Sequence, residues 1–400
     1  MSRRSYRLSR WCLSQRYLFA ATLIPIFLLP LRALRGEPAP QRSTPLASVP
    51  TEIRVSSTDW WPMTGSSDRS QYVGTSACAK CHAEKTASQV KTSMARAGFR
   101  AADSEWLVKN PDLSLHLGAY DYRLTTKDGD VKLSVTDGRD STTKRLEWAL
   151  GDGSFGQSYV YREENKYYEA QLSFYTRIHA LDTTTGHMEP RTIQTAAGGL
   201  TSPKTIRLCF GCHSTASATN DRFDPDKATM GVTCEACHGP GAQHVALMSM
   251  EGQNAKGSIM NPASLSPPDL VDFCGACHRT SADAILARAE TAGVSSVRMQ
   301  PYRLEKSKCW GKGDARITCV ACHDPHVQIV RDASTYDTKC LRCHVQKGAT
   351  RLPAGFAPGC KVQTKNCVTC HMPEIEVPGT HTLFIDHWIR INQPGAPYPD

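Results

Sequence analysis

The chain has 400 residues, of which 40% are hydrophobic and 21% charged, with 17 Cys and a formal net charge of +9. This composition excludes a disordered chain. Disulfide-rich scaffolds are usually much shorter, so the cysteines of so long a chain need a different explanation.

The first 36 residues predict an export signal. Several arginines precede the apolar stretch YLFAATLIPIFLLPL at 17–31, which is too short to span a bilayer comfortably. The alternative is an uncleaved membrane anchor. Residues 1–36 hold seven Arg and no acid, which leaves 40 basic and 38 acidic residues elsewhere. The net positive charge therefore comes mostly from the predicted targeting segment and does not indicate nucleic-acid binding. A linker rich in Pro, Ser and Thr is predicted over 37–71.

Seven copies of a Cys-x-x-Cys-His motif follow, and they use 14 of the 17 Cys. Two thiols at this spacing can bond to the two vinyl groups of one haem, and the next histidine then binds the iron. We predict seven covalent c-type haems. Paired Cys-x-x-Cys units also bind zinc or serve in thiol redox chemistry, but neither use requires a histidine after every second cysteine. The predicted thioether residues are Cys78, Cys81, Cys209, Cys212, Cys234, Cys237, Cys274, Cys277, Cys319, Cys322, Cys340, Cys343, Cys367 and Cys370. The predicted proximal ligands are His82, His213, His238, His278, His323, His344 and His371.

The remaining histidines are candidate distal ligands, and Met94 is a further candidate. They are His116, His179, His187, His244, His326, His381 and His387. His326 comes one turn after His323 and emerges on the same side of that haem, so we expect it to bind a neighbouring haem. His244, six residues after His238, invites the same interpretation. The alternative is an ordinary core or surface histidine, and for Met94 simple packing in a helix.

More than 120 residues without a motif separate the first two motifs. Within them, YDYRLTTKDGDVKLSVTDG alternates in hydrophobicity and breaks at KDGD, which predicts a hairpin. We predict a first haem segment at 72–118, a β-rich insertion at 119–200 with a small antiparallel sheet near 119–174, and a six-haem domain at 201–400. The segments between later motifs are too short to build cores, so the expected fold is mainly short α-helices and irregular loops around a haem core. The chain without haem is then expected to be unfolded.

Two further cysteines and the haem charges give two more expectations. Cys309 and Cys360 either form a disulfide or remain two separate thiols. Each haem adds two propionates and one positive charge when oxidised, so the net charge of the oxidised holoprotein is expected to be about −5. This charge predicts an isoelectric point below 7.

The stretches YVGTSACAKCH, GVTCEACHGPGAQH, CVACHDPH, CVTCHMP and DHWIR resemble the cytochrome c-554 type of multihaem cytochrome, especially its exported relatives that often carry tetratricopeptide repeats. The resemblance covers most of residues 72–390 and implies electron transfer. In such relatives the histidines corresponding to His244 and His387 are typical ligand candidates.

Filled bis-histidine coordination favours an electron carrier, because it leaves no open iron for a substrate. We expect an exported, periplasmic protein that links a membrane quinol-linked donor to a periplasmic acceptor through redox partner proteins. Membrane contact is expected only if the N-terminal segment is retained. The alternative is a reductase of a small nitrogen or sulfur oxyanion at one five-coordinate haem. A third possibility, a wire-like assembly, has no support from sequence features.

Overall fold

The computed structural model describes residues 68–219, 222–250, 255, 257–286, 293–310, 316–345 and 357–393. The predicted signal or anchor (1–36) and nearly all of the predicted linker (37–71) lie outside these residues. All described residues belong to one unit, Thr44–Asp400. None of the helices in this described part is long and apolar enough to cross a membrane.

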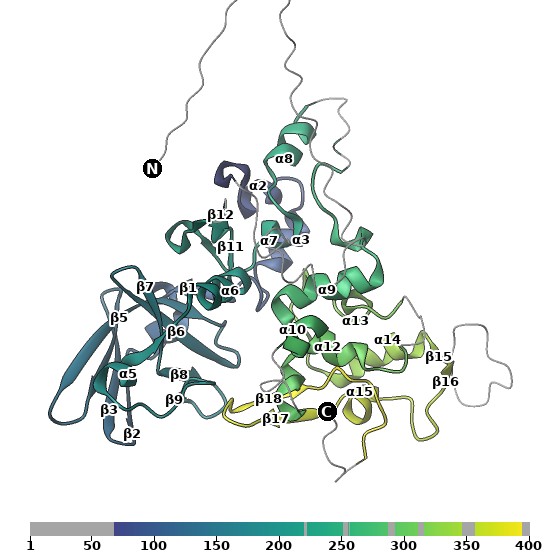
Figure 1. The fold of residues 1–400 in the computed structure, drawn as a ribbon. Helices are drawn as coiled ribbons and strands as arrows, with labels where there is room; N and C mark the ends of the chain where they lie inside the picture. Colours follow the sequence, from purple (N-terminus) through teal and green to yellow (C-terminus); the bar gives the residue numbers. More distant parts are fainter. Residues whose placement is uncertain are drawn as a thin grey trace, which may run out of the picture. The chain divides into compact units, whose positions relative to one another are not determined.

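A ten-stranded antiparallel sheet, drawn in blue in Figure 1, fills the interval between the first two motifs. Its main path runs β10-β7-β6-β5-β4-β3-β2, with β1 paired to β5 and with β8 paired to β6 and β9. The strands are β1 (Gly98–Arg100), β2 (Asp112–Leu117), β3 (Tyr120–Lys127), β4 (Asp130–Thr136), β5 (Ser141–Leu150), β6 (Gly156–Glu163), β7 (Lys166–Ala170), β8 (Leu172–Tyr175), β9 (Ala180–Thr183) and β10 (Gly198–Leu200).

The hairpin between β3 and β4 forms where the sequence predicts it. Lys127 pairs with Asp130, and the two turn residues, Asp128 and Gly129, have φ of 50° and 77°. Positive φ at both positions matches the turn type whose twist suits a two-residue hairpin. Alternate residues of both strands are buried, among them Leu124 of β3, so one face of the hairpin packs into the core.

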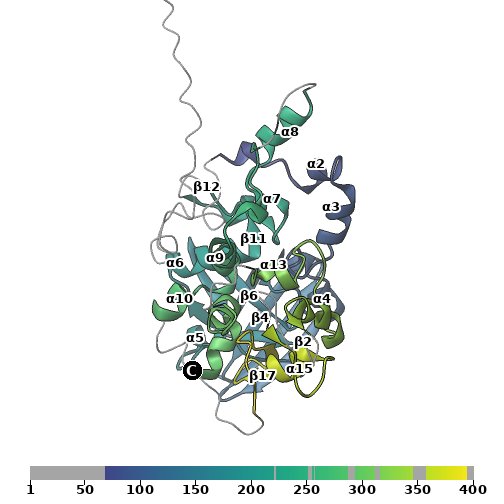
Figure 2. The same ribbon diagram turned by 90° about the vertical axis from the view of Figure 1, so that its right-hand side faces the viewer.

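The prediction of mainly short helices and loops around a haem core, with a small β insertion near 119–174, is wrong. The sheet extends from residue 98 to residue 200 and has a side-chain core of its own, which includes Tyr122, Leu133 and Phe174. Short helix α5 (Ile193–Ala197) packs against β4 and β5 (Figure 2). The error has a physical cause. The first and last strands in the sequence, β1 and β10, are only three residues long, and β10 begins with two glycines, so neither shows the alternation by which a strand is recognised.

Short helices carry the haem motifs or lie between them. They are α2 (Thr75–Ala79), α3 (Ala83–Gln89), α6 (Pro203–His213), α7 (Cys234–His238), α8 (Ala242–Met248), α9 (Pro267–His278), α10 (Ser281–Leu286), α12 (Gln300–Glu305), α13 (Cys319–Cys322), α14 (Asp337–Leu341) and α15 (Cys367–His371); α4 (Glu105–Lys109) lies beside the sheet. The two longest, α6 and α9, begin alike: Ser202 and Ser266 cap the first turn and a proline follows. Both helices end at a motif histidine, so the motif forms the last turn of each helix.

Four two-stranded sheets complete the described structure. They are β11 (Ser214–Thr215) with β14 (Thr229–Met230), β12 (Ala218–Thr219) with β13 (Arg222–Phe223), β15 (His344–Val345) with β16 (Ala357–Pro358), and β17 (Glu374–Val377) with β18 (Thr382–Ile385). The β17–β18 hairpin contacts the large sheet region. The rings of Phe384 and Phe155 stack 6.1 Å apart, and Glu376 forms an ion pair with Arg177 at 3.2 Å. The predicted domain boundaries remain predictions.

Candidate haem sites

The two cysteines of each motif lie one helical turn apart. Helices α6, α7, α9 and α15 contain a whole motif, α13 ends at a second cysteine, and α2 and α14 lead into motifs. After α2, the N–H groups of Cys81 and His82 both donate to the carbonyl of Cys78, at 3.2 and 2.8 Å. Residues three apart on a helix face the same side. The two thiols of a motif therefore face one edge of a porphyrin, as attachment requires.

Three motif histidines bond a backbone carbonyl through Nδ1. The pairs are His213 with Ala97 at 2.6 Å, His238 with Met260 at 2.9 Å, and His371 with Arg390 at 2.9 Å. A metal-binding histidine typically donates its second ring N–H in this way, which leaves Nε2 for the metal. Desolvation lowers the pKa of His213 and of His278, so these imidazoles are neutral at pH 7, the form that binds iron.

Three motif histidines each face the ring of a second histidine. The pairs are His82 and His244, with centres 6.5 Å apart and planes at 18°; His238 and His326, at 6.0 Å and 17°; and His323 and His387, at 6.3 Å and 44°. In every pair the second histidine lies beyond the motif of the first, and none faces the motif nearest to it in sequence. His326 faces His238 and not His323.

This spacing fits an iron between the rings. A metal–imidazole bond is about 2 Å long, and the bonded nitrogen lies about 1.1 Å from the centre of its ring. Two imidazoles that bind one metal from opposite sides therefore have ring centres about 6 Å apart. Rings that stack in direct contact have centres much closer together than this. The second histidines also have Nδ1 engaged: His244 with Ser258 Oγ at 3.1 Å, His326 with Asp324 at 3.0 Å, and His387 with the Ile385 carbonyl at 3.0 Å. Desolvation lowers the pKa of His387 to about 4, so it is neutral.

The other predicted distal ligands lie in different surroundings. His116 is exposed on β2 and bonds Asp121 at 2.8 Å, and His179 occupies an exposed turn. His187 contacts Gln171 at 3.0 Å and Glu169 at 3.3 Å, so both of its ring nitrogens are engaged. His381 bonds Asp182 through Nε2 at 2.7 Å. Met94 is half-buried, and its carbonyl accepts from Val232 N–H at 2.9 Å.

Thiols of different motifs lie beside one another and interact. These neighbours are Cys78 and Cys234, Cys212 and Cys277, Cys274 and Cys319, and Cys340 and Cys367. Cys237 lies near Cys274, and Cys322 lies near Cys340. Burial raises the pKa of Cys237 to about 11, so this thiol is protonated at neutral pH. The motifs therefore form a continuous series.

Two buried acids, which sequence reasoning missed, connect pairs of motifs. Glu235 lies between the cysteines of the 234–238 motif and accepts from Val73 N–H at 2.9 Å and Gly74 N–H at 2.8 Å, just before the 78–82 motif. Asp337, at the start of α14, accepts from Cys367 N–H at 2.8 Å. This N–H lowers the pKa of Asp337. The one sequence signal for the role of Glu235 is that an acidic residue lies between the two cysteines of a Cys-x-x-Cys motif.

Paired Cys-x-x-Cys units could also hold zinc. Structural zinc needs about four converging ligands. Within the described ranges, no group of three or more His, Cys, Asp or Glu side chains is arranged to hold a metal ion. Of the predicted disulfide cysteines, Cys309 lies near Cys322, and Cys360 Sγ accepts from Val362 N–H at 3.4 Å. That disulfide remains a prediction.

Comparison with known proteins agrees with haem attachment. The family model described as cytochrome c554 and c-prime matches residues 167–239. The multihaem cytochrome MtrA of Shewanella baltica is 28% identical over 190 residues, which cover 44% of this chain and 48% of that protein. The matched part thus spans about half of that relative. The crystal structure of the outer cell wall cytochrome OcwA aligns over 80% of both chains with 17% identity and a TM-score of 0.46.

The family model and the curated relative both point to the chemistry that the repeated motif indicates. The helical geometry places the paired thiols of each motif where one porphyrin can take both. The repeated motif and both comparisons support a multihaem c-type cytochrome.

Proposed function

We propose that the protein is an exported heptahaem electron carrier. The seven Cys-x-x-Cys-His motifs each bind one haem through both thiols and the motif histidine. His244, His326 and His387 are the distal ligands of the haems whose proximal ligands are His82, His238 and His323. When bound, the haems supply one-electron redox chemistry, and the chain holds them at fixed spacing.

The three imidazole pairs carry this proposal. Each pair has the spacing of two ligands on one iron, and each joins residues of two motif segments. A ligand that belongs to a neighbouring segment ties two haems together. Electron transfer becomes steeply slower with distance, so a carrier benefits from such ties. Six-coordinate irons also exclude a substrate from these haems.

The thiol contacts support one order of transfer. They connect the motifs at 78–82, 234–238, 274–278, 319–323, 340–344 and 367–371 in series, and the motif at 209–213 joins at 274–278. The motifs at 78–82, 367–371 and 209–213 are thus the ends of the connected set. The second cysteines Cys81 and Cys370 are exposed at two of these ends, and Cys322 is exposed within the series, so redox partners could approach the haems at these three places.

The N-terminal sequence bears on the location and the partners. The basic and apolar N-terminal sequence favours export, and c-type haems are attached outside the cytoplasm. We therefore place the carrier between a quinol-linked donor at the membrane and a periplasmic acceptor.

The proposal is tested by electron paramagnetic resonance (EPR) of the oxidised protein together with intact mass. We expect seven haem masses per mature chain. His326→Ala should convert one haem to high spin, and free imidazole should restore low spin. The control His116→Ala should match wild type. Fewer haem masses, or an unchanged His326→Ala spectrum, would contradict the haem count or the ligand assignment.

A reductase remains the second candidate because two predicted ligands have other partners. His187 and His381 bond carboxylates of the sheet region, so fewer imidazoles are left for the other four irons. A high-spin ferric signal that nitrite or hydroxylamine alters in the wild type would favour a reductase. Low-spin signals alone would exclude it.

A further inference from the structure

A fully buried ion pair lies beside His387. Arg303 of α12 and Asp386 are both 0% exposed at their side chains. The guanidinium donates to both carboxylate oxygens, from Nε to Oδ1 at 2.9 Å and from Nη2 to Oδ2 at 2.9 Å. Such a two-bond fork fixes the orientation of both groups as well as their distance. Arg390 Nη1 also bonds Asp386.

The segment that carries this acid is anchored to the last motif. Asp386 N–H donates to the Pro373 carbonyl at 2.9 Å, and Arg390 N–H donates to the His371 carbonyl at 3.2 Å. His371 Nδ1 in turn bonds the Arg390 carbonyl at 2.9 Å. Residues 386–390 are therefore held at both ends by the segment of the 367–371 motif.

Hydrogen bonds to Asp386 and Ser307 hold the backbone around His387 in place. Asp386 Oδ1 accepts from Trp388 N–H at 3.0 Å. The buried Ser307 accepts from Ile389 N–H at 2.8 Å and lies 3.4 Å from the His387 carbonyl. His387 thus sits in a short turn whose flanking residues are both fixed, and its side chain faces His323.

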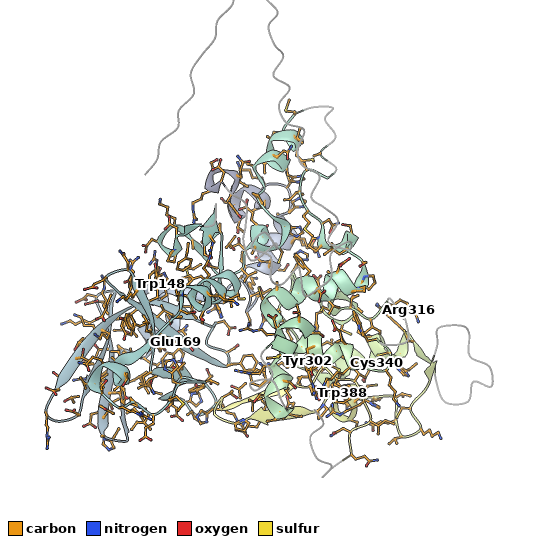
Figure 3. All side chains as sticks on the ribbon, in the orientation of Figure 1. Trp148, Glu169, Tyr302, Arg316, Cys340 and Trp388 are labelled. Carbon is orange, nitrogen blue, oxygen red and sulfur yellow. The ribbon has the colours of Figure 1, made fainter. Side chains whose placement is uncertain are left out.

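Cations cover the indole of Trp388. Arg303, Lys306 and Arg390 lie 4.9, 5.2 and 5.2 Å from its ring centre. Lys306 also lies 4.7 Å from the ring of Tyr302, which Figure 3 labels beside Trp388. These contacts stabilise the position of the residue that follows His387.

We infer that Asp386, clamped by Arg303, is a positioning residue that holds His387 at the distal face of the haem bound by Cys319, Cys322 and His323. This inference rests on the proposed ligand role of His387. The clamp limits rotation of the turn, so His387 stays within bonding distance of the iron. Without the clamp, the turn is free to move and the iron loses its sixth ligand for part of the time.

The charge of Asp386 has a second effect. A carboxylate near a haem stabilises the ferric state, so its removal should raise the reduction potential of this haem. Replacement by asparagine removes the charge with little change of shape. A purely structural residue far from the haem would not shift the potential.

The test compares four full-length holoproteins by EPR. His387→Ala defines the high-spin signal of this haem without its distal ligand. Asp386→Asn should show a high-spin signal at the same g values, which accounts for part or all of one haem per chain. Free imidazole should remove this high-spin signal in both variants. An EPR-monitored redox titration should show a positive shift in Asp386→Asn. Asp182→Asn is the matched control, since Asp182 also contacts a histidine, His381, and should leave the spectrum unchanged.

A wild-type spectrum for Asp386→Asn, with a high-spin haem in His387→Ala, overturns the inference but keeps the ligand assignment. A wild-type spectrum for His387→Ala overturns the ligand assignment itself. If Asp386→Asn fails to accumulate with full haem content, Arg303→Lys replaces it, because lysine keeps the charge and removes the two-bond fork. The same high-spin signal is expected there, and a wild-type spectrum overturns the inference.

Discussion

The carboxylate of Asp337 accepts a hydrogen bond from the backbone N–H of Cys367, the first cysteine of the last motif, at 2.8 Å. Glu235 contacts the backbone before the first motif in the same manner. In both places the thiols of the two connected motifs also interact. Buried acids therefore set the spacing of neighbouring haem sites twice in this chain.

Asp337→Ala should lower the free energy of unfolding by about 1–3 kcal/mol, because the N–H groups of Asn366 and Cys367 lose their acceptor. Denaturant unfolding of the holoprotein, followed by haem absorbance, measures the change. The control Asp140→Ala removes an exposed turn acid and should stay within about 0.5 kcal/mol of wild type. Equal stability of the two variants would show that the acid does not fix the motif.

Sequence spacing predicts local geometry well in this protein. The Cys-x-x-Cys-His motif specifies a helical turn, and the KDGD stretch specifies a hairpin, because each depends only on neighbouring residues. The idea that His326 turns toward a different haem also came from local geometry. Its partner, His238, could not be predicted, since the contact depends on how separate segments pack.

Long-range pairings explain what the sequence did not reveal. Arg303 and Asp386 are charged, and composition alone places such residues at the surface. Only the fold brings them together without water. The large sheet was underestimated for the same reason: β1 and β10 are recognisable as strands only through their partners β5 and β7.

Gly231→Ala should destabilise the protein strongly. Its φ is +81°, and an added Cβ would lie 1.9 Å from the Ala95 carbonyl oxygen. Gly186→Ala is the matched control, because Gly186 has φ of +94° but open space around it. The control should cost about 1–2 kcal/mol for the backbone strain alone. Thermal unfolding should show a larger loss for Gly231→Ala, and equal losses would mean that the backbone there can shift.

Acid should weaken the contact between the sheet and residue 226. Asp226 bonds Arg162 at 2.6 Å, and this bond, with Arg100 as a second partner, lowers the pKa of Asp226. Because the folded pKa lies below the unfolded value of about 3.9, the stabilisation is complete above that value and disappears as pH falls through the folded pKa. The stability difference between wild type and Asp226→Asn should therefore stay constant from neutral pH down to about pH 4 and shrink below it. A constant difference for Asp226→Asn over this pH range would exclude the electrostatic explanation.

Removal of haem should leave the large sheet folded, in contrast to the unfolded chain that the sequence suggested. The main core of the sheet contains no motif residue. In protein expressed without haem attachment, hydrogen exchange should still protect the amides of residues 120–136. The amides of α7 and α15 should lose protection, because these short motif helices bury no apolar side chain of their own. Unprotected strands would show that the sheet also needs haem.

The holoprotein should focus below pH 7, although the sequence has a calculated isoelectric point of about 8.8. Loss of the arginine-rich N-terminal segment and the haem propionates together reverse the sign of the net charge. Isoelectric focusing of purified holoprotein measures this directly. A basic value would mean fewer haems or a retained N-terminus, and intact mass distinguishes the two.

The pairing of His82 with His244, and of His238 with His326, has a consequence for biogenesis. The two histidines of these pairs are 162 and 88 residues apart in the sequence, so they meet only when the chain folds. A haem can therefore be attached to its motif while its second axial position is still vacant. On the proposed ligand assignment, the second axial ligand then arrives only with tertiary folding, so the visible spectrum would report how far each site has matured.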